Sequence, residues 1–127
     1  MHQVTILLAE DNKVVSDAVR DTLAAQGWRV EACHNGTQAL RLIEGDLHFD
    51  ALLLDNYLPG VSGLELTRRV RSLAHRRFIP VVIFSASEAR LEAEHAGADA
   101  FLRKPEDVSR IALTLARLVA DAAADRT

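Results

Sequence analysis

Several polar side chains that can bind a metal ion or a phosphoryl group stand directly after short runs that predict strands. They are Glu10, Asp11, Asp55, Ser85 and Lys104. An unbroken apolar run is typical of a strand buried on both faces of a parallel sheet. Open parallel sheets bind ligands where loops leave the carboxyl ends of their strands. We therefore expect these side chains to meet in one crevice.

Asp55 is the member of this group that most needs a functional explanation. It follows the apolar residues 51–54 and precedes the turn residues Pro59-Gly60. It could instead cap the next helix or shape the turn, but Ser62 is better placed as the helix cap. Asp55 is therefore left without a structural role.

The chemistry of the group follows from three carboxylates and one ammonium. Carboxylates a few ångströms apart raise one another's pKa, and a divalent cation removes that cost. A set of oxygen ligands without His or Cys selects a hard ion, and few protein ligands suit Mg²⁺ better than Ca²⁺. We expect a magnesium site in which Lys104 adds a second positive charge for a phosphoryl group and Ser85 adds a hydroxyl. Asp55 would then be a carboxylate nucleophile.

Strands and helices alternate along the chain and must position these side chains. Strands are predicted at residues 4–9, 28–33, 51–54, 81–84 and 99–103, and helices at residues 14–25, 35–45, 62–75, 88–96 and from 108 almost to the end. Asn12 and Ser62 are expected to cap helices, and Gly27 and Gly97 to end them.

This alternation predicts one domain over residues 1–127 with a doubly wound α/β fold. The connections are too short for anything but right-handed crossovers. The expected architecture is flavodoxin-like, a five-stranded parallel sheet in the order 2-1-3-4-5 with five helices. A chain of 127 residues is long enough to bury a core without disulfides or structural metals.

The composition argues against several classes of protein. No apolar run is long enough to span a bilayer and residues 1–3 carry no secretory signal, so we expect no membrane contact and a cytoplasmic location. A net charge of −3 argues against nucleic-acid binding. The arginines between residues 68 and 77 are interpreted as a solvated helix end. The single cysteine, Cys33, is interpreted as a small buried hydrophobe.

Taken together and in order, these features are similar to a known pattern. The matching features are the acidic pair Glu10-Asp11, Asp55 followed by Leu58-Pro59 and by Gly63, Ser85-Ala86, Phe101, and Lys104-Pro105. Each alone is weak, but together they occur on the expected strand ends. Along essentially its whole length the chain resembles the receiver domain of two-component response regulators.

The resemblance implies a phosphorylation-dependent switch rather than a conventional enzyme. Asp55 would accept a phosphoryl group from a histidine kinase or a histidine phosphotransfer protein, and the only catalysis would be this acceptance and autodephosphorylation. Asp11, Asp55 and the backbone carbonyl of Tyr57 would hold Mg²⁺, with Glu10 acting through a metal-bound water. Ser85 would move to bond the phosphoryl group and Phe101 would turn inward. The surface of the fourth helix, fifth strand and last helix would change as a result.

Three features depart from the family pattern. The segment from Ser85 to Gly97 is shorter than expected by roughly one helical turn, which predicts a muted rotation of Phe101 or a shifted fourth helix. Glu106-Asp107 stands where an aromatic residue is common, so packing beneath the last helix is open. Tyr57 either shields the acyl phosphate from water or packs on the surface.

Three other functions use related chemistry or the same fold. An aspartate-nucleophile phosphatase would need a second aspartate as general acid at the position of Tyr57. A flavin-binding domain of the same fold would need a phosphate loop where Glu10-Asp11 would repel phosphate. A receiver-like interaction module that is not phosphorylated remains an alternative, because of the shortened segment.

A partner surface is expected on the fourth helix, fifth strand and last helix. Its apolar residues would be Leu91 and His95 on the fourth helix, and Leu113, Ala116 and Ala120 on the last, with Arg110 and Arg117 at the rim. The opposite sides of these helices would face the core, through Ala89, Ala93 and Ala96 and through Val108, Ile111, Ala112, Leu115, Leu118 and Val119. This surface would form a homodimer or bind an output partner. The sequence ends about twenty residues after Lys104, so we expect it to contain no output domain.

Overall fold

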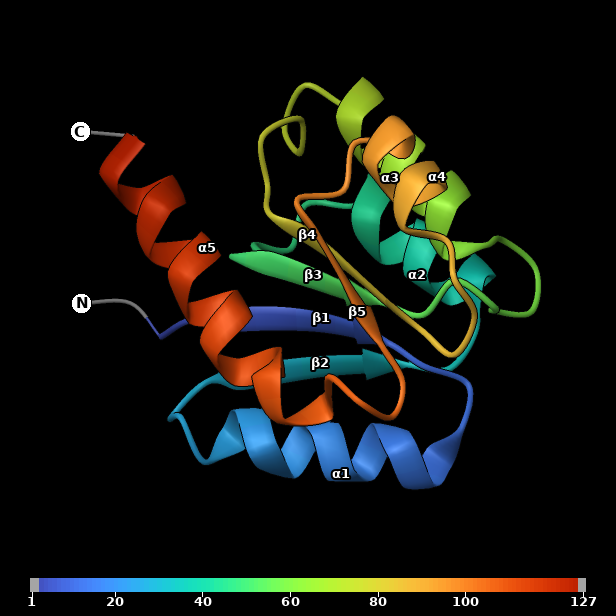
Figure 1. The fold of residues 1–127 in the computed structure, drawn as a ribbon. Coiled ribbons are helices and arrows are strands. Elements are labelled where there is room, and N and C mark those ends of the chain that lie inside the picture. Colours follow the sequence, from blue (N-terminus) through green and yellow to red (C-terminus); the bar gives the residue numbers. More distant parts are fainter. Residues whose placement is uncertain (1–2, 126–127) are drawn as a thin grey trace.

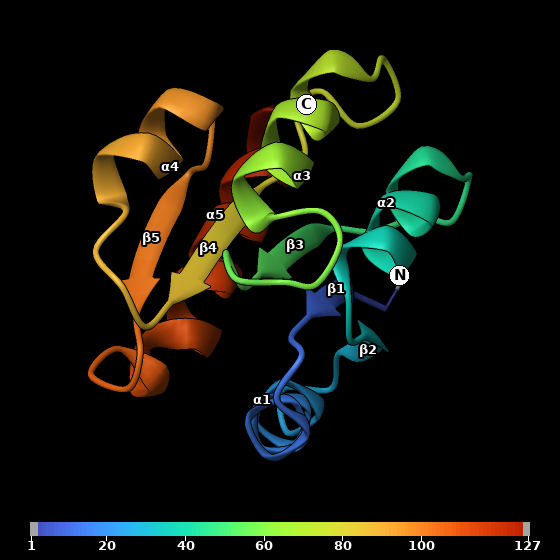
Figure 2. The ribbon, with the colours of Figure 1, turned by 90° about the vertical axis from the view of Figure 1, so that its right-hand side faces the viewer.

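One parallel sheet with helices on both sides makes up the computed structural model, which describes residues 3–125 (Figure 1, Figure 2). Its strands are β1 (Thr5–Ala9), β2 (Arg29–Cys33), β3 (Ala51–Leu54), β4 (Val81–Ser85) and β5 (Ala100–Arg103). Its helices are α1 (Lys13–Ala24), α2 (Gly36–Glu44), α3 (Gly63–Ser72), α4 (Arg90–Ala96) and α5 (Ile111–Asp125). The strands are parallel in the order β2-β1-β3-β4-β5, which confirms the predicted fold. Within residues 3–125, no helix has both the length and the apolar character needed to cross a bilayer.

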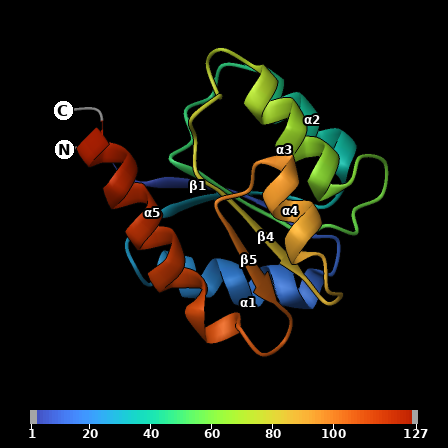
Figure 3. The ribbon, with the colours of Figure 1, turned by 45° about the horizontal axis from the view of Figure 1, so that its top comes forward.

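Alternate residues of the strands supply two apolar layers on opposite faces of the sheet. Leu7, Leu52 and Ile83 pack with α2, α3 and α4, whereas Ile6, Leu53 and Val82 pack with α1 and α5. The two groups of helices lie on opposite sides of the sheet in Figure 3. Burying each such side chain contributes about 1.5–3 kcal/mol. Covering the sheet on both faces leaves its carboxyl edge as the place for polar chemistry.

The predicted helix caps position the segments next to that edge. The Asn12 side chain accepts a hydrogen bond from the Val15 N–H, and the Ser62 hydroxyl accepts one from the Glu65 N–H. Asn35 caps α2 in the same way. Gly97 ends α4 with a φ of 102°, a left-handed conformation that glycine adopts without strain. Asn12, Asn35 and Ser62 thus set where α1, α2 and α3 start after their loops.

The last two helices begin later than predicted. α4 starts at Arg90 rather than Glu88, and residues Val108–Arg110 form a 3-10 turn ahead of α5. Val108 is 39% exposed, so its assignment to the core was wrong. The cause is Asp107, whose carboxylate accepts the Arg103 N–H (2.9 Å) and the Arg110 guanidinium (3.3 Å). These bonds form a tight turn that delays the start of the α-helix.

Two of the arginines predicted to form a solvated helix end, Arg71 and Arg76, are instead held by hydrogen bonds, whereas Arg68, Arg69 and Arg77 are exposed as predicted. Arg76 is buried and donates to the carbonyls of Leu42, Ile43 and Gly45, the last at 2.9 Å, which satisfies the C-terminal end of α2. Arg71 donates to the carbonyls of Gly97, Arg77 and Ile79 and pairs with Asp99. Both side chains thus fasten the segment between α3 and β4 to its neighbours.

Cys33 behaves as predicted. It is buried at the end of β2, and burial raises the pKa of its thiol to about 11. A thiol held in its neutral form is a poor nucleophile, so Cys33 acts as a small apolar residue.

Candidate metal and phosphoryl site

The predicted site residues stand at the carboxyl edge because the strand ladders carry on through them. The Asp55 N–H donates to Ala9 O at 2.9 Å, and the Glu10 N–H donates to Cys33 O at 3.1 Å. The Lys104 N–H donates to Ser85 O at 2.9 Å. Each bond holds a site residue against the neighbouring strand, so the sheet itself sets their spacing.

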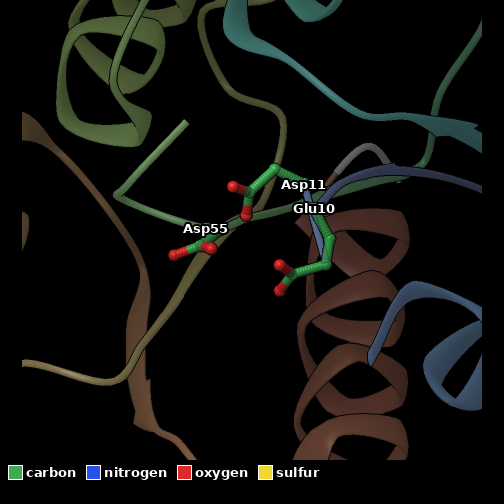
Figure 4. Close-up of side chains that lie close together, drawn as sticks. All are labelled: Glu10, Asp11 and Asp55. Carbon is green, nitrogen blue, oxygen red and sulfur yellow. The ribbon is translucent and has the colours of Figure 1, made fainter. Parts of the chain in front are cut away.

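Three carboxylates converge at this edge, as Figure 4 shows. Glu10, Asp11 and Asp55 each offer an oxygen within 4.8 Å of the others. Glu10 and Asp55 are buried, whereas Asp11 is exposed. The predicted meeting of these residues is therefore observed, and Asp11 keeps one side of the cluster open to solvent.

Lys104 crosses from β5 to this cluster. Its ammonium donates to Glu10 Oε1 and, at 3.0 Å, to Asp55 Oδ2. It also lies 5.0 Å from the centre of the Phe84 ring. Burial by itself lowers the pKa of Lys104, but the hydrogen bond to Glu10 and the charge of Asp55 outweigh burial and raise this pKa. The lysine is therefore held as a cation between two acids.

Glu10 is fixed at both of its carboxylate oxygens. Oε1 contacts Lys104, and Oε2 accepts the Asn12 N–H at 3.1 Å. Burial raises the pKa of Glu10, the two hydrogen bonds oppose that effect, and the charge of Asp55 adds to it. The Asn12 contact was not predicted from the sequence, although an acidic residue two positions before a helix cap could have suggested it.

Asp55 is held by the loop that follows it. Its Oδ1 accepts the Tyr57 N–H at 3.2 Å. The buried Asn56 accepts the Leu64 N–H through its side chain and the Gly63 N–H through its carbonyl, which ties the loop to α3. A Cβ on Gly63 would lie 2.4 Å from Asp55 O, so only glycine fits there. This role of Asn56 was not predicted from the sequence, although asparagine suits such turns.

Ser85 is fully buried at the end of β4, and a second serine links it to Tyr57. The Ser87 N–H donates to Ser85 Oγ at 3.4 Å, and the Ser87 hydroxyl donates to the Tyr57 hydroxyl at 2.9 Å. Tyr57 therefore reaches from the loop after β3 to the loop after β4. Ser87 was not singled out in the sequence.

Phe101 is already turned into the core. It is 5% exposed, and it belongs to the apolar layer that also contains Ile83, Ala89 and Ala93. Arg90 covers it: the guanidinium lies 5.2 Å from the ring centre and donates to Phe101 O at 3.3 Å. A further inward rotation is not needed to bury this ring.

The chain also matches a known protein family over most of its length. The family model of the response regulator receiver domain matches residues 6–116. The chain belongs to this family. Response regulator MprA of Mycobacterium ulcerans is 36% identical over 105 residues, which cover 80% of this chain and 44% of that protein. MprA of Mycobacterium tuberculosis is 35% identical with the same coverage. This receiver domain thus spans less than half the length of these relatives.

Solved receiver structures share the fold. The receiver domain of the sensor histidine kinase PA1611 from Pseudomonas aeruginosa, solved with a magnesium ion coordinated in its active site cleft, has a TM-score of 0.84 and 30% identity, covering 94% of this chain and 99% of that one. The receiver domain of Francisella response regulator 1452 has a TM-score of 0.86 at 23% identity with the same coverage. The latter likeness supports the fold alone.

Proposed function

We propose that residues 1–127 form one receiver domain that accepts a phosphoryl group on Asp55 from a histidine kinase or a histidine phosphotransfer protein. The observation that carries this proposal is the placement of Lys104, whose ammonium touches Glu10 and Asp55 beside the exposed Asp11. Family membership supports the same role. A cytoplasmic location belongs to the proposal, since it would give access to such donors.

The proposed reaction moves a phosphoryl group from a donor imidazole to Asp55. A carboxylate oxygen of Asp55 attacks phosphorus, the bond from phosphorus to the donor imidazole breaks, and that imidazole leaves with the electron pair and takes up a proton. Lys104 offsets the added negative charge, and the Ser85 hydroxyl can turn from Ser87 to donate to a phosphoryl oxygen. The site serves as acceptor, not as a catalyst that turns over a separate substrate.

The carboxylate cluster fits Mg²⁺. Its donors are all carboxylate oxygens, and the exposed Asp11 leaves room for retained waters, which Mg²⁺ prefers to keep. Asp11, Asp55 and the backbone carbonyl of Tyr57 would hold the ion, and Glu10, whose two oxygens are already engaged, would act through water. A bound Mg²⁺ would neutralise charge on the phosphoryl oxygens.

Asp11 gives a direct test of the metal site. Since it is the exposed carboxylate, Asp11→Ala should reduce Mg²⁺ affinity at least tenfold, about 1.4 kcal/mol, without unfolding the domain. Isothermal titration calorimetry with MgCl₂ measures this, and Asp17→Asn, on the exposed surface of α1, is the control. Equal Mg²⁺ binding by the Asp11→Ala and wild-type proteins would remove Asp11 from the site.

Phosphorylation with a small donor tests the main proposal. Wild-type protein incubated with acetyl phosphate and Mg²⁺ should gain one phosphoryl group on Asp55, located by mass spectrometry after borohydride reduction, and Asp55→Asn should gain none. Asp17→Asn should be labelled normally. Labelling that persists in Asp55→Asn would sink the assignment. A wild-type protein that resists labelling by both acetyl phosphate and a phosphorylated histidine phosphotransfer protein would favour the unphosphorylated interaction module.

The surface of α4, β5 and α5 is the proposed output. Leu91 and Leu113 are exposed there, and Arg90, Arg110 and Arg117 line a groove over β5. Because Phe101 is already buried, the change reaches this surface through Ser85 and the start of α4, with only a small movement of Phe101. A homodimer or an output partner would bind here.

A further inference from the structure

A cleft lies at the edge of the sheet opposite the carboxylates. Its volume is about 710 Å³, and residues 48–50, 74–80 and 99, which precede β3, β4 and β5, line one side of it. Leu118, Asp121, Ala122 and Asp125 of α5 line the other. In Figure 1 the C-terminal turns of α5 stand apart from the segment that joins α3 to β4. The proposed phosphoryl chemistry does not use this cleft.

An aromatic residue is presented at this cleft by a fastened segment. Phe78 is 86% exposed, the highest value among the large apolar side chains of the described chain. Its neighbours are held in place, because Arg71 donates to Arg77 O at 2.9 Å and to Ile79 O at 2.7 Å. A rigid aromatic side chain loses little entropy on binding. Phe78 therefore has the properties of an interface anchor.

The cleft offers apolar surface that such an anchor can fill. Phe49 and Pro80 are buried, and Ile79, Leu118 and Ala122 are partly exposed. Phe78 itself lies at the rim of the cleft. One molecule therefore carries both an exposed aromatic anchor and an apolar cleft that such an anchor can fill.

The two walls of the cleft carry opposite charges. Arg77 lies on the wall after α3, and Asp121 and Asp125 lie on the α5 wall; all three are exposed. Within residues 3–125 none of the three makes an ion pair. The other acids of the cleft are engaged, Asp99 with Arg71 and Asp50 with His48. Arg77, Asp121 and Asp125 are thus available to a partner.

We propose that this cleft is the interface of a two-fold symmetric dimer of this chain. A two-fold axis brings the basic wall of each copy against the acidic wall of the other, so Arg77 faces Asp121 and Asp125 twice, and Phe78 of each copy enters the cleft of its partner. An acidic or a basic peptide would instead meet a like charge on one wall. A second copy is the partner whose charges match both walls.

A charge exchange tests the proposal with the whole chain. Sedimentation velocity over a concentration series should show a monomer–dimer equilibrium for the wild type. Arg77→Asp and the double variant Asp121→Arg/Asp125→Arg should each weaken dimerisation at least tenfold, because each homodimer would oppose like charges at both symmetry-related contacts. An equimolar mixture of the two variants should recover dimers, since every contact in the heterodimer is again between opposite charges.

Apolar substitutions separate this interface from the output surface. Phe78→Ser should weaken dimerisation at least tenfold, and Leu113→Ser, an exposed leucine on α5 outside the cleft, should leave it unchanged. Circular dichroism confirms that each variant is folded. A wild type that stays monomeric up to millimolar concentration, a mixture of charge variants that fails to recover dimers, or a dimer lost in Leu113→Ser but kept in Phe78→Ser would overturn the proposal. None of these outcomes depends on phosphorylation of Asp55.

Discussion

The Lys104 ammonium contributes both to the stability of the site and to its proposed chemistry. Its ammonium is the nearest cation to Glu10 and Asp55, and both carboxylates are buried. The two carboxylates offer oxygens within 4.8 Å of each other, so their negative charges repel, and burial strengthens the repulsion. The protein therefore keeps an arrangement suited to an incoming phosphoryl group by holding one cation in place.

Replacing Lys104 should expose that repulsion. Lys104→Met should lower the free energy of unfolding by about 1–3 kcal/mol, because two buried carboxylates lose their partner. Added Mg²⁺ should recover much of the loss, since it supplies positive charge to the same oxygens. Urea unfolding with and without MgCl₂ measures both effects.

The other lysine of the chain is the matched control. Lys13 pairs with Asp17 on the exposed surface of α1, so Lys13→Met should change stability by less than about 0.5 kcal/mol. A Lys104→Met protein as stable as wild type without Mg²⁺ would mean that the two acids do not repel each other in the folded state.

Tyr57 is the residue whose two interpretations the structure helps to separate. Its hydroxyl accepts a hydrogen bond from Ser87. Tyr57 therefore connects the loop that follows Asp55 with the loop that follows Ser85. We predict that Tyr57→Ala shortens the lifetime of the acyl phosphate by roughly two- to tenfold, because water reaches it more easily. Loss of label after removal of acetyl phosphate gives the rate.

Two further variants distinguish shielding from a general loosening of the loop. Tyr57→Phe keeps the ring and should show a smaller effect than Tyr57→Ala, and Ser87→Ala should resemble Tyr57→Phe because both remove the same hydrogen bond. Identical lifetimes in wild type and Tyr57→Ala would leave Tyr57 as an ordinary surface residue.

At the scale of elements, the ends of helices depend on side chains from elsewhere in the chain. Arg76 fills the C-terminal end of α2 with hydrogen bonds to three carbonyls, and its guanidinium lies 5.0 Å from the centre of the Phe49 ring. Arg76→Ala should therefore cost about 2–4 kcal/mol, since buried carbonyls lose their donors. Thermal or urea unfolding measures the loss. Arg68→Ala, in the same cluster but exposed, should stay within about 0.5 kcal/mol of wild type.

Arg76 also shows what the sequence could and could not predict. Local patterns predicted the strands and the caps at Asn12 and Ser62. They also predicted that Glu10, Asp55 and Lys104 meet, because strand ends share one edge of the sheet. The burial of Arg76 depends on carbonyls more than thirty positions away, and an arginine after a helix usually faces water. Nothing local distinguishes it from Arg77 beside it.

The same limit applies to Phe101 and to the start of α5. The sequence predicted that Phe101 lies on β5, but it did not predict the contact with Arg90 of α4, whose guanidinium lies 5.2 Å from the ring centre. The 3-10 turn at Val108–Arg110 follows from side-chain bonds of Asp107 to residues on both sides of it. The sequence pattern could not predict these contacts, because they form only when the elements pack together.

At the scale of the whole molecule, the domain presents different surfaces around one parallel sheet. The carboxyl edge carries Asp55, the opposite edge carries the cleft beside Phe78, and the side formed by α4, β5 and α5 carries Leu91 and Leu113. Of the two proposed interaction surfaces, the one with α4 lies closer to the site along the chain, since Ser85 is followed within five residues by Arg90, the first residue of α4. Phosphorylation is therefore expected to act on one interaction surface and not on the other.

This separation predicts which substitutions respond to a phosphoryl mimic. Beryllofluoride with Mg²⁺ should increase self-association of the wild type through α4, β5 and α5, and a Leu91→Ser/Leu113→Ser double variant should lose that increase while keeping the basal equilibrium. Phe78→Ser should do the reverse, with a weaker basal equilibrium and an increase that survives. Sedimentation velocity in both states measures all of these. If beryllofluoride increases association equally in the double variant, the phosphorylation-dependent surface lies elsewhere, and the exposed face of α1, which begins three residues after Glu10, is the next to test.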